Sequence, residues 1–367
     1  MSMLNADRHT RTQHLLDSAV TLARLPGIAV EVRTGHQTWY GSAGMADTAA
    51  HRPRHPEDRF RIGSITKTFV ATVMLQLAAE NELDLDEPIG KRLPGLVRGN
   101  GHDGDAVTVR QLLNHTSGIF NYTLDQQALN QHDRHPPELL VQIAVAHPPH
   151  FAPGTSWAYS NTNYILAGLI IEQVTGRPLA EEIDHRISRP LQLPATYLPS
   201  GDDPTIHGRH VRHYTRLNIS GADAETHDAT EFDPSLFWAA GAMISTTGDL
   251  ARFLQALLGG QLLPPALQHE MFATVPTTNW IPTAEYGLGI SSLDLPHRGK
   301  AWGMGGATFG SWTYAYGTRD GKHIIVANVN GDWADDRWED PIGILTDLLH
   351  TELGASTTTT PPLPDNA

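Results

Sequence analysis

A chain of 367 residues with 40 acidic and 26 basic side chains has a formal net charge of −14, which argues against a surface built to neutralise phosphates and so against nucleic acid as a partner. The length suffices for one large domain or two closely joined ones. Cysteine is absent, which excludes disulfides, thiolate nucleophiles and cysteine-ligated metal sites.

The first 27 residues lack the features of a secretory leader. They contain Arg8, Arg11 and His14 but no run of about seven apolar residues and no small-residue cleavage site, so we expect a cytoplasmic protein. No stretch approaches the roughly 18 to 20 apolar residues that spanning a bilayer requires, and the sequence therefore predicts no membrane insertion.

The predicted elements begin with an amphipathic helix over 11–25, which ends at Pro26-Gly27. Two β-rich runs, 28–32 and 38–41, follow as a hairpin. From Ser64 to Glu80 apolar residues recur every four positions, which predicts a buried helix of about four turns.

Prolines break the segment 84–155, and helical pieces are expected only at 109–114 and 138–146. The run 163–175 is apolar on almost every side and ends at Gly176, which predicts a central helix. A further helix is expected over 247–258. Strands are predicted at 286–292, 311–317 and 323–328.

The order of these elements, strands then helices then strands, predicts an α+β fold in which both chain ends build one sheet around an inserted helical region. We assign 1–62 and 240–355 to the α/β sheet region and 63–239 to a mostly helical region with insertions. The end of the chain, 356–367, is rich in Thr and Pro and is expected to be a disordered tail.

Ser64 and Lys67 lie three positions apart at the start of the predicted buried helix, so their side chains share one face. The helix dipole and partial desolvation both lower a lysine pKa, so a neutral Lys67 can accept the Ser64 proton. The N–H of Ser64 can face a developing oxyanion. A lone Ser-x-x-Lys is more often a helix cap followed by a solvated lysine, but lysine is scarce here, at positions 67, 91, 300 and 322.

Tyr159 and Asn161 stand two residues apart before the central helix and project to the same side if the chain is extended. A tyrosine whose pKa is lowered by a nearby ammonium can relay a proton to a leaving group, and Asn161 can hydrogen-bond a substrate amide. Taken alone, Asn161 is equally explained as a helix cap.

The stretch Gly303-Met-Gly-Gly-Ala307 precedes the strand predicted at 311–317, and such small residues let a substrate backbone lie against a strand edge. A dinucleotide-binding loop is excluded, because Thr308 stands where its fingerprint needs glycine and no phosphate-loop lysine follows. The Gly-x-Ser-x-Gly elbow of α/β-hydrolases is absent as well.

Ser64-Ile-Thr-Lys67, Tyr159-Ser-Asn161 and a glycine-rich third motif, in this order, resemble the serine β-lactamase and penicillin-binding-protein superfamily. Further strings, over about residues 28–350, are similar to class C β-lactamases and D-alanyl-D-alanine carboxypeptidases: Phe60-Arg-Ile-Gly-Ser64, Leu113-Asn-His-Thr-Ser-Gly118, Tyr159-Ser-Asn-Thr-Asn163, Tyr286-Gly-Leu-Gly289 and Thr313-Tyr-Ala-Tyr316. The resemblance implies an antiparallel sheet flanked by helices with an all-helical region, an acyl-enzyme on Ser64, an oxyanion hole from the N–H groups of Ser64 and Ala307, and no cofactor.

The chain departs from this superfamily in its third motif. Met304 stands where the motif begins with Lys or His, so proton transfer falls more heavily on Lys67 and Tyr159. Where carboxypeptidase members hold a free carboxylate with hydroxyls and an Arg, this chain has Gly305, Ala307 and Ser292. We hypothesise a substrate with a neutral or blocked group beyond the scissile bond: an ester, an amide, or a peptidyl thioester passed to an amine.

These arguments give one set of site residues. The predicted catalytic residues are Ser64, Lys67 and Tyr159, and the predicted substrate-binding residues are Asn161, Trp302, Met304, Gly305, Gly306 and Ala307. Trp302 and Trp312 are expected at the rim of the cleft.

No metal site is predicted. His207, His210 and His213 recur every three residues, but they lie in a loop-like region without a His-Glu-x-x-His pattern, and we expect surface histidines. The acidic stretch 332–336 with Asp340 lacks EF-hand spacing and is expected to be a solvated loop.

The sequence therefore favours a serine hydrolase or acyltransferase that acts on a small-molecule or peptide substrate with an amide or ester bond, of the D-amino-acid or peptide type. Penicillin binding is compatible with this hypothesis. The alternative is a penicillin-binding-like sensor or binding module that kept the fold and lost turnover through the change at Met304. The oligomeric state stays open.

Overall fold

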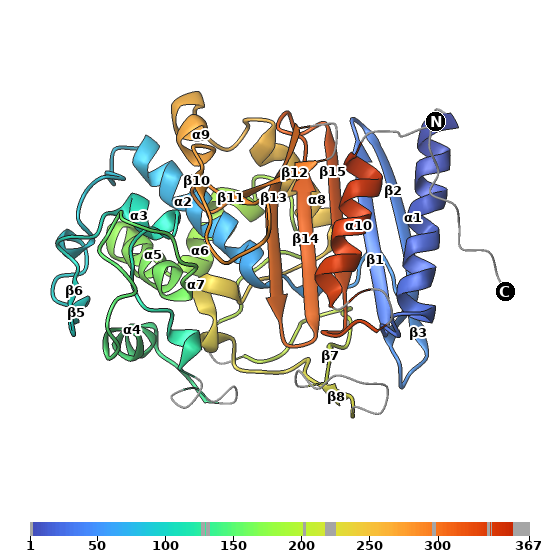
Figure 1. Cartoon of the computed structure of the whole chain (residues 1–367), viewed down its shortest axis with the longest axis horizontal. Helices are drawn as coiled ribbons and strands as arrows, with labels where there is room; N and C mark the ends of the chain where they lie inside the picture. The colour runs from blue at the N-terminus through green and yellow to red at the C-terminus, as the bar shows by residue number, and fades with distance from the viewer. Residues whose placement is uncertain are drawn as a thin grey trace.

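The computed structural model describes residues 3–125, 129, 133–200, 203–216, 225–295, 299–335, 338 and 340–354. The strands of its main sheet are β1 (Gly27–Thr34), β2 (Gln37–Asp47), β3 (Arg52–Pro53), β10 (Val275–Pro276), β11 (Glu285–Tyr286), β12 (Ser291–Leu295), β13 (Gly299–Thr308), β14 (Ser311–Gly317) and β15 (His323–Val329). They form one antiparallel sheet in the order β10-β11-β12-β13-β14-β15-β1-β2-β3 (Figure 1). Because β15 pairs with β1, strands from the two ends of the chain lie side by side inside the sheet.

Alternating side chains of the sheet face two different hydrophobic cores. On β15, Ile324 and Val326 belong to one core, whereas Ile325 and Ala327 belong to the other. The helices α1 (Met3–Thr21) and α10 (Pro341–Leu353) supply the second core, and Figure 1 shows α10 lying across that face of the sheet. The helix α8 (Thr247–Leu258) packs on the opposite face and supplies the first core.

The middle of the chain forms the helical region at the left of Figure 1. Its helices are α2 (Thr66–Ala79), α3 (Val109–Leu113), α4 (Pro137–Val145), α5 (Asn161–Thr175), α6 (Leu179–Ile183) and α7 (Trp238–Gly241), and α9 (Pro265–Met271) packs against α2. The helix α5 is central, because it contacts α2, α3, α4, α6 and α7.

Short turns and two-stranded ladders complete the described structure. The single helical turns are η1 (Gly63–Ile65), η2 (Ile89–Lys91), η3 (Tyr122–Leu124), η4 (Asp184–Ser188) and η5 (Pro234–Leu236). The ladders pair β4 (Phe60–Arg61) with β9 (Ile244–Ser245), β5 (Arg98–Gly99) with β6 (His102–Asp103), and β7 (Tyr214–Thr215) with β8 (His227–Asp228).

The predicted α+β fold is confirmed, while several element boundaries differ. The first helix begins at Met3 and ends at Thr21, so it lies earlier than 11–25. The predicted strand 286–292 is two strands, β11 and β12, because Gly287 N–H donates to the Ile290 carbonyl and Gly289 takes a φ of +75° in the turn between them.

The helix α10 was not predicted at all. Asp340, expected in a solvated acidic loop, is its N-cap and accepts hydrogen bonds from the N–H groups of Ile342 and Gly343, with Pro341 at the first position of the helix. The division of the chain at 62/63 and 239/240 stays a prediction, and the tail 356–367 lies outside the described residues. In the described part of the chain, no helix combines the length and apolarity needed to cross a membrane.

Candidate active site

The backbone at Ser64 packs closely against strand β13. Ser64 lies in η1, directly before α2, and follows Gly63, whose φ of +53° is in the left-handed region that favours glycine. A Cβ on Gly63 would lie 2.5 Å from the Ala307 nitrogen, and a Cβ on Gly306 would lie 2.8 Å from the Ser64 nitrogen. Only hydrogen at positions 63 and 306 therefore allows the backbone around Ser64 to lie this close to the backbone of Gly306 and Ala307.

Two side chains converge on the hydroxyl of Ser64. Lys67 Nζ is 3.1 Å from Ser64 Oγ, and the Tyr159 hydroxyl donates a hydrogen bond of 2.7 Å to the same oxygen. Lys67 Nζ also lies 2.7 Å from Asn161 Oδ1 and 2.6 Å from the Ala240 carbonyl oxygen. Lys67 lies in the first turn of α2, and Asn161 is the first residue of α5. The starts of these two helices therefore bring the groups around Ser64 together.

Burial sets the protonation state of Lys67. Its side chain is fully buried, and this burial holds the pKa of its amine well below the usual value of 10.5. A neutral amine has two N–H groups and one lone pair. Asn161 Oδ1 and the Ala240 carbonyl can only accept, so they take two N–H groups of Lys67, and the third position on Nζ, which is a lone pair in the neutral amine, faces Ser64 Oγ.

Tyr159 differs from the sequence prediction in its protonation. We expected a nearby ammonium to lower its pKa, but burial raises the pKa of Tyr159, and its hydrogen bond with Ser64 offsets this only in part. Tyr159 is therefore a phenol that donates to Ser64 Oγ, with Lys67 Nζ 4.8 Å from the centre of its ring. The prediction was wrong because it left out the burial of the phenol.

The glycine-rich stretch forms part of strand β13 itself rather than a lead-in to the next strand. Its partner β12 reaches only to the Ser291–Gly303 pair, while β14 pairs with β13 up to Thr308. In the part of the sheet that the structure describes, no strand pairs with Met304–Thr308 on the β12 side, and η1 contacts β13 there. This leaves strand edge beside Ser64, in agreement with a substrate backbone lying against it.

The remaining predicted residues have different surroundings. Met304 is buried in the first hydrophobic core, and Gly305 faces the ring of Tyr314. Trp302 packs edge-on against Phe272, and the guanidinium carbon of Arg319 lies 3.3 Å from the centre of the Phe272 ring. Trp302 thus lies on the same face of β13 as Met304 but two residues further from Gly306.

Trp312 was expected at the rim of the cleft, and it packs instead against the second core, which α1 and α10 supply. The sequence argument also missed the groups that orient Asn161. Its amide Nδ2 donates to Thr123 Oγ1 at 3.2 Å, and its backbone N–H donates to Asn121 Oδ1 at 3.1 Å. No local pattern marked these residues, because they reach the site through η3, where Asn121 is the N-cap and Thr123 lies within the turn.

The histidines at 207, 210 and 213 do not form a metal site. Within the described residues, no three His, Cys, Asp or Glu side chains are grouped so that they could hold a metal ion. The expectation of surface histidines is wrong for His213, which is fully buried, whereas His207 is exposed and pairs with Asp203 at 2.6 Å.

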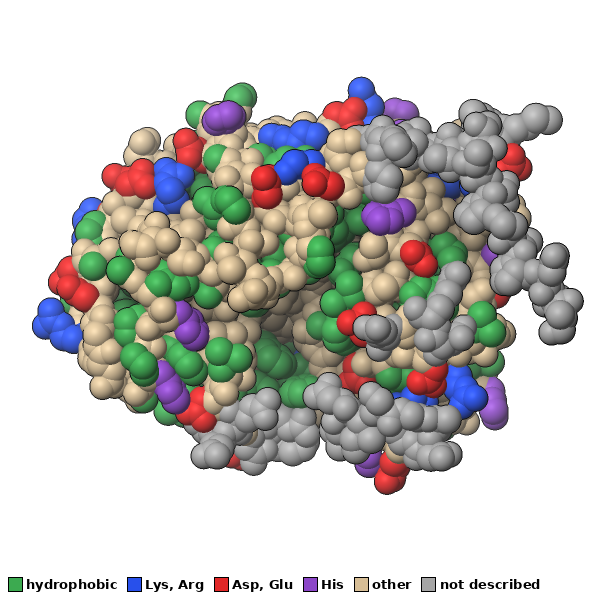
Figure 2. All heavy atoms as spheres, viewed as in Figure 1, with side chains coloured by type: hydrophobic (Ala, Val, Ile, Leu, Met, Phe, Trp, Pro, Cys, Tyr) green, Lys and Arg blue, Asp and Glu red, His purple; other side chains and the backbone are tan. Residues whose placement is uncertain are grey.

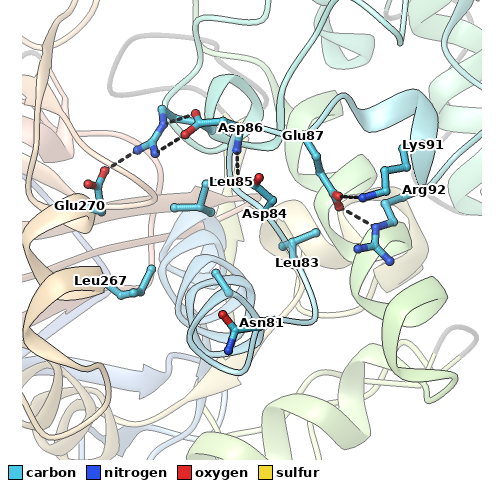
Figure 3. Close-up of a pocket in the computed structure, with 12 residues that line it drawn as sticks. Asn81, Leu83, Asp84, Leu85, Asp86, Glu87, Lys91, Arg92, Leu267 and Glu270 are labelled. Carbon is cyan, nitrogen blue, oxygen red and sulfur yellow. Dashed lines mark hydrogen bonds and ion pairs between the residues drawn. The ribbon is translucent and has the colours of Figure 1, made fainter.

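Two views show hollows on the molecule. Figure 2 shows a face hollowed between the helical region and the sheet, with hydrophobic side chains at the lower end of the hollow. A separate pocket, shown in Figure 3, lies beside the end of α2 and is lined by ion pairs of Arg110 with Asp86 and Glu270 and of Glu87 with Lys91 and Arg92. It contains none of the residues around Ser64, and its ion pairs join α9 to the loop after α2.

Comparisons with known proteins give a family model and several similar proteins. The family model described as Beta-lactamase matches residues 13–343. Esterase EstB of Burkholderia gladioli is 30% identical over 322 residues, which cover 80% of this chain and 78% of that protein.

Two solved structures have similar folds over nearly their whole length. A D-stereospecific amidohydrolase from Streptomyces sp. is 44% identical with a TM-score of 0.84, covering 94% of this chain and 98% of the other. The D-amino acid amidase from Ochrobactrum anthropi SV3, complexed with L-phenylalanine amide, is 26% identical with a TM-score of 0.81 and the same two coverages, 94% and 98%.

Proposed function

Since the chain belongs to the beta-lactamase family and is a serine hydrolase, we propose that it cleaves amide or ester bonds of D-amino-acid derivatives through an acyl-enzyme on Ser64. The observation that carries the proposal is the placement of Ser64 Oγ between the Lys67 amine and the Tyr159 hydroxyl, at 3.1 and 2.7 Å. A nucleophile needs a base within hydrogen-bond reach, and the buried neutral Lys67 meets this need.

Acylation follows from the hydrogen-bond directions at Ser64. The Lys67 lone pair takes the Ser64 proton as Oγ bonds to the substrate carbonyl carbon, and the N–H groups of Ser64 and Ala307 stabilise the oxyanion. When the intermediate collapses, the bond to the leaving group breaks, and the leaving amine or alkoxide takes the Tyr159 proton. Tyr159 recovers a proton from the Lys67 ammonium, so the net transfer is from Ser64 to the leaving group.

Deacylation reverses these roles. A water molecule attacks the acyl carbonyl and gives its proton to Lys67, directly or through Tyr159, and the proton returns to Ser64 Oγ as the acid leaves. The side-chain amide of Asn161 is bonded to Lys67 and Thr123, and its backbone N–H donates to Asn121. This amide stands beside the reacting groups and is proposed to hydrogen-bond the substrate amide.

The substrate class is inferred from the third motif and from the relatives. Buried Met304 supplies no cation, and Gly305 and Ala307 supply no hydroxyl, so a free carboxylate beyond the scissile bond has no partner there. The names of the similar proteins describe an esterase, a D-stereospecific amidohydrolase and a D-amino acid amidase. We therefore propose D-amino-acid amides and esters as substrates.

A turnover panel tests the proposal: D- and L-phenylalanine amide, the matching methyl esters, and a peptide that ends in free D-Ala, each with wild type and Ser64→Ala. The expected result is hydrolysis of the D-amide and the esters by wild type and none by Ser64→Ala. Hydrolysis by Ser64→Ala at the wild-type rate, or turnover of the free-acid peptide alone, contradicts the proposal. Acylation without turnover would favour the sensor.

A further inference from the structure

The loop after α3 carries a histidine that the proposed mechanism does not use. His115 is fully buried and has a φ of +63°, which is uncommon for a residue other than glycine. Its ring centre lies 4.5 Å from that of Tyr159. A buried imidazole in a left-handed backbone conformation needs a specific set of partners, because both features cost free energy.

Those partners lie on both sides of Tyr159. The Ala158 N–H donates to the His115 carbonyl at 3.1 Å, and the Ser160 N–H donates to His115 Nδ1 at 3.2 Å. The backbone and the ring of one residue therefore hold the N–H groups of the two residues that flank Tyr159.

The surrounding hydrogen bonds fix the tautomer of the ring. The Ile119 N–H donates to Ser117 Oγ, so the Ser117 hydroxyl donates to Asn163 Oδ1 at 2.7 Å. The other side of that amide, Asn163 Nδ2, then donates to His115 Nδ1 at 3.2 Å. Because Nδ1 accepts from two N–H groups, it carries no proton, and the neutral ring has its proton on Nε2.

The rest of the environment keeps the ring uncharged. Burial, and to a smaller degree the nearby Lys67, hold the pKa of His115 well below its usual value. The titratable groups around the ring are Lys67, Tyr159, Tyr164 and Tyr286, and among the described residues Nε2 has no hydrogen-bond partner. A protonated ring would place an Nδ1–H against the Ser160 N–H and break both bonds that it accepts.

We propose that His115, as a neutral acceptor at Nδ1, is a positioning residue that sets where the Tyr159 hydroxyl meets Ser64. The expected effect on acylation rests on the proposed function, whereas the hydrogen bonds and the tautomer of His115 do not. The Tyr159 hydroxyl donates to Ser64 Oγ, and His115 accepts from the N–H groups of the residues before and after Tyr159, so the position of that hydroxyl relative to Ser64 depends on His115.

Two near-isosteric variants test the acceptor. His115→Asn places a carbonyl oxygen near the position of Nδ1 and tolerates the left-handed backbone, whereas His115→Leu removes the acceptor. Acylation by a D-phenylalanine ester is followed in single turnover, per site titrated with a fluorophosphonate. We expect His115→Leu to acylate about 10²-fold more slowly than wild type, and His115→Asn to recover most of that loss. Equal losses in both variants would overturn the proposal.

A double-mutant cycle with Tyr159→Phe separates positioning from a general loss of structure. If His115 acts through the Tyr159 hydroxyl, His115→Leu lowers acylation by less than about 3-fold once that hydroxyl is gone. Additive losses would show that His115 acts independently of Tyr159 and would overturn the proposal. His213→Leu is the control, since His213 is equally buried but its ring has no hydrogen-bond partner among the described residues. The acylation rate of His213→Leu is expected to equal that of wild type.

The tautomer is tested without any substrate. In protein labelled with ¹⁵N-histidine, the signal that disappears in His115→Asn belongs to His115, and its ¹⁵N shifts report which nitrogen carries the proton. The expected result is an unprotonated Nδ1 and a protonated Nε2 at neutral pH. A proton on Nδ1 overturns the proposal. An inactive wild type with the expected tautomer would contradict the proposed function and leave the structural assignment standing.

Discussion

Gly306 and Ser64 are in direct backbone contact across β13 and η1: a Cβ at position 306 would lie 2.8 Å from the Ser64 nitrogen and 2.0 Å from the Ile62 carbonyl oxygen. This contact holds the backbone at Ser64 against β13, next to Ala307. Any side chain at 306 must displace η1, because both of these neighbouring atoms are backbone.

Gly306→Ala is therefore expected to lower kcat by about 10²- to 10³-fold, the size of effect that removal of one oxyanion donor has in other serine hydrolases. Its measurement is kcat on the D-amide alongside Gly104→Ala, where a Cβ would meet no atom closer than 3.3 Å. Equal activity of the two variants would contradict the assigned oxyanion hole.

The buried amine of Lys67 makes stability depend on pH. The unfolded chain binds a proton on Lys67 below its ordinary pKa of 10.5, whereas the folded protein binds it only at much lower pH. Between the two pKa values the unfolded state holds more protons, so this residue makes the wild type more stable as pH rises.

Lys67→Met lacks this dependence. The free energy of unfolding of Lys67→Met minus that of wild type should be larger at pH 7 than at pH 10 by more than about 1 kcal/mol, so the variant is relatively more stable at pH 7. Urea denaturation at the two pH values measures it, and Lys322→Met, at an exposed lysine, is the control. A constant difference across this range would show that Lys67 is charged in the folded protein.

The same protonation states predict the pH profile of acylation. The rate should rise through the lowered pKa of Lys67 and stay level above it, because burial raises the pKa of Tyr159 above its ordinary value of 10.0. Single-turnover acylation between pH 5 and 10 checks this, with a non-ionising ester as substrate. A fall in rate between pH 8 and 10 would indicate that Tyr159 loses its proton there.

Because Met304 is uncharged, we expect the enzyme to select against a free carboxylate beyond the scissile bond. With no cation or hydroxyl at this wall, a D-amino-acid amide should have a kcat/KM at least about 10-fold higher than the matching substrate with a free carboxylate, since an unpaired buried charge is costly. The ratio of the two kcat/KM values measures it. A preference for the free acid would show that another group binds the carboxylate.

The sequence predicted the local parts of this site well. The three-residue spacing of Ser64 and Lys67 and the buried helix behind them are properties of one segment, so periodicity sufficed. The meeting of Ser64 with Tyr159, 95 residues away, came from the resemblance to a known superfamily rather than from spacing.

What the sequence missed depends on tertiary contacts. The direction of the pKa change of Tyr159 follows from its burial, and the second acceptor for Lys67 is a main-chain carbonyl, at Ala240, that any residue could supply. The helix α10 had its signals, an N-cap Asp340 followed by Pro341, but the surrounding acidic residues favoured a loop.

The most direct test of the central claim is the mass of the intact protein, quenched within the first turnovers of a D-phenylalanine ester. We expect wild type to gain the mass of one phenylalanyl group, located by peptide mapping on Ser64, and Ser64→Ala to gain none. An acyl group on another residue, or steady turnover by wild type with no adduct at any quench time and after every trapping attempt, would contradict an acyl-enzyme on Ser64.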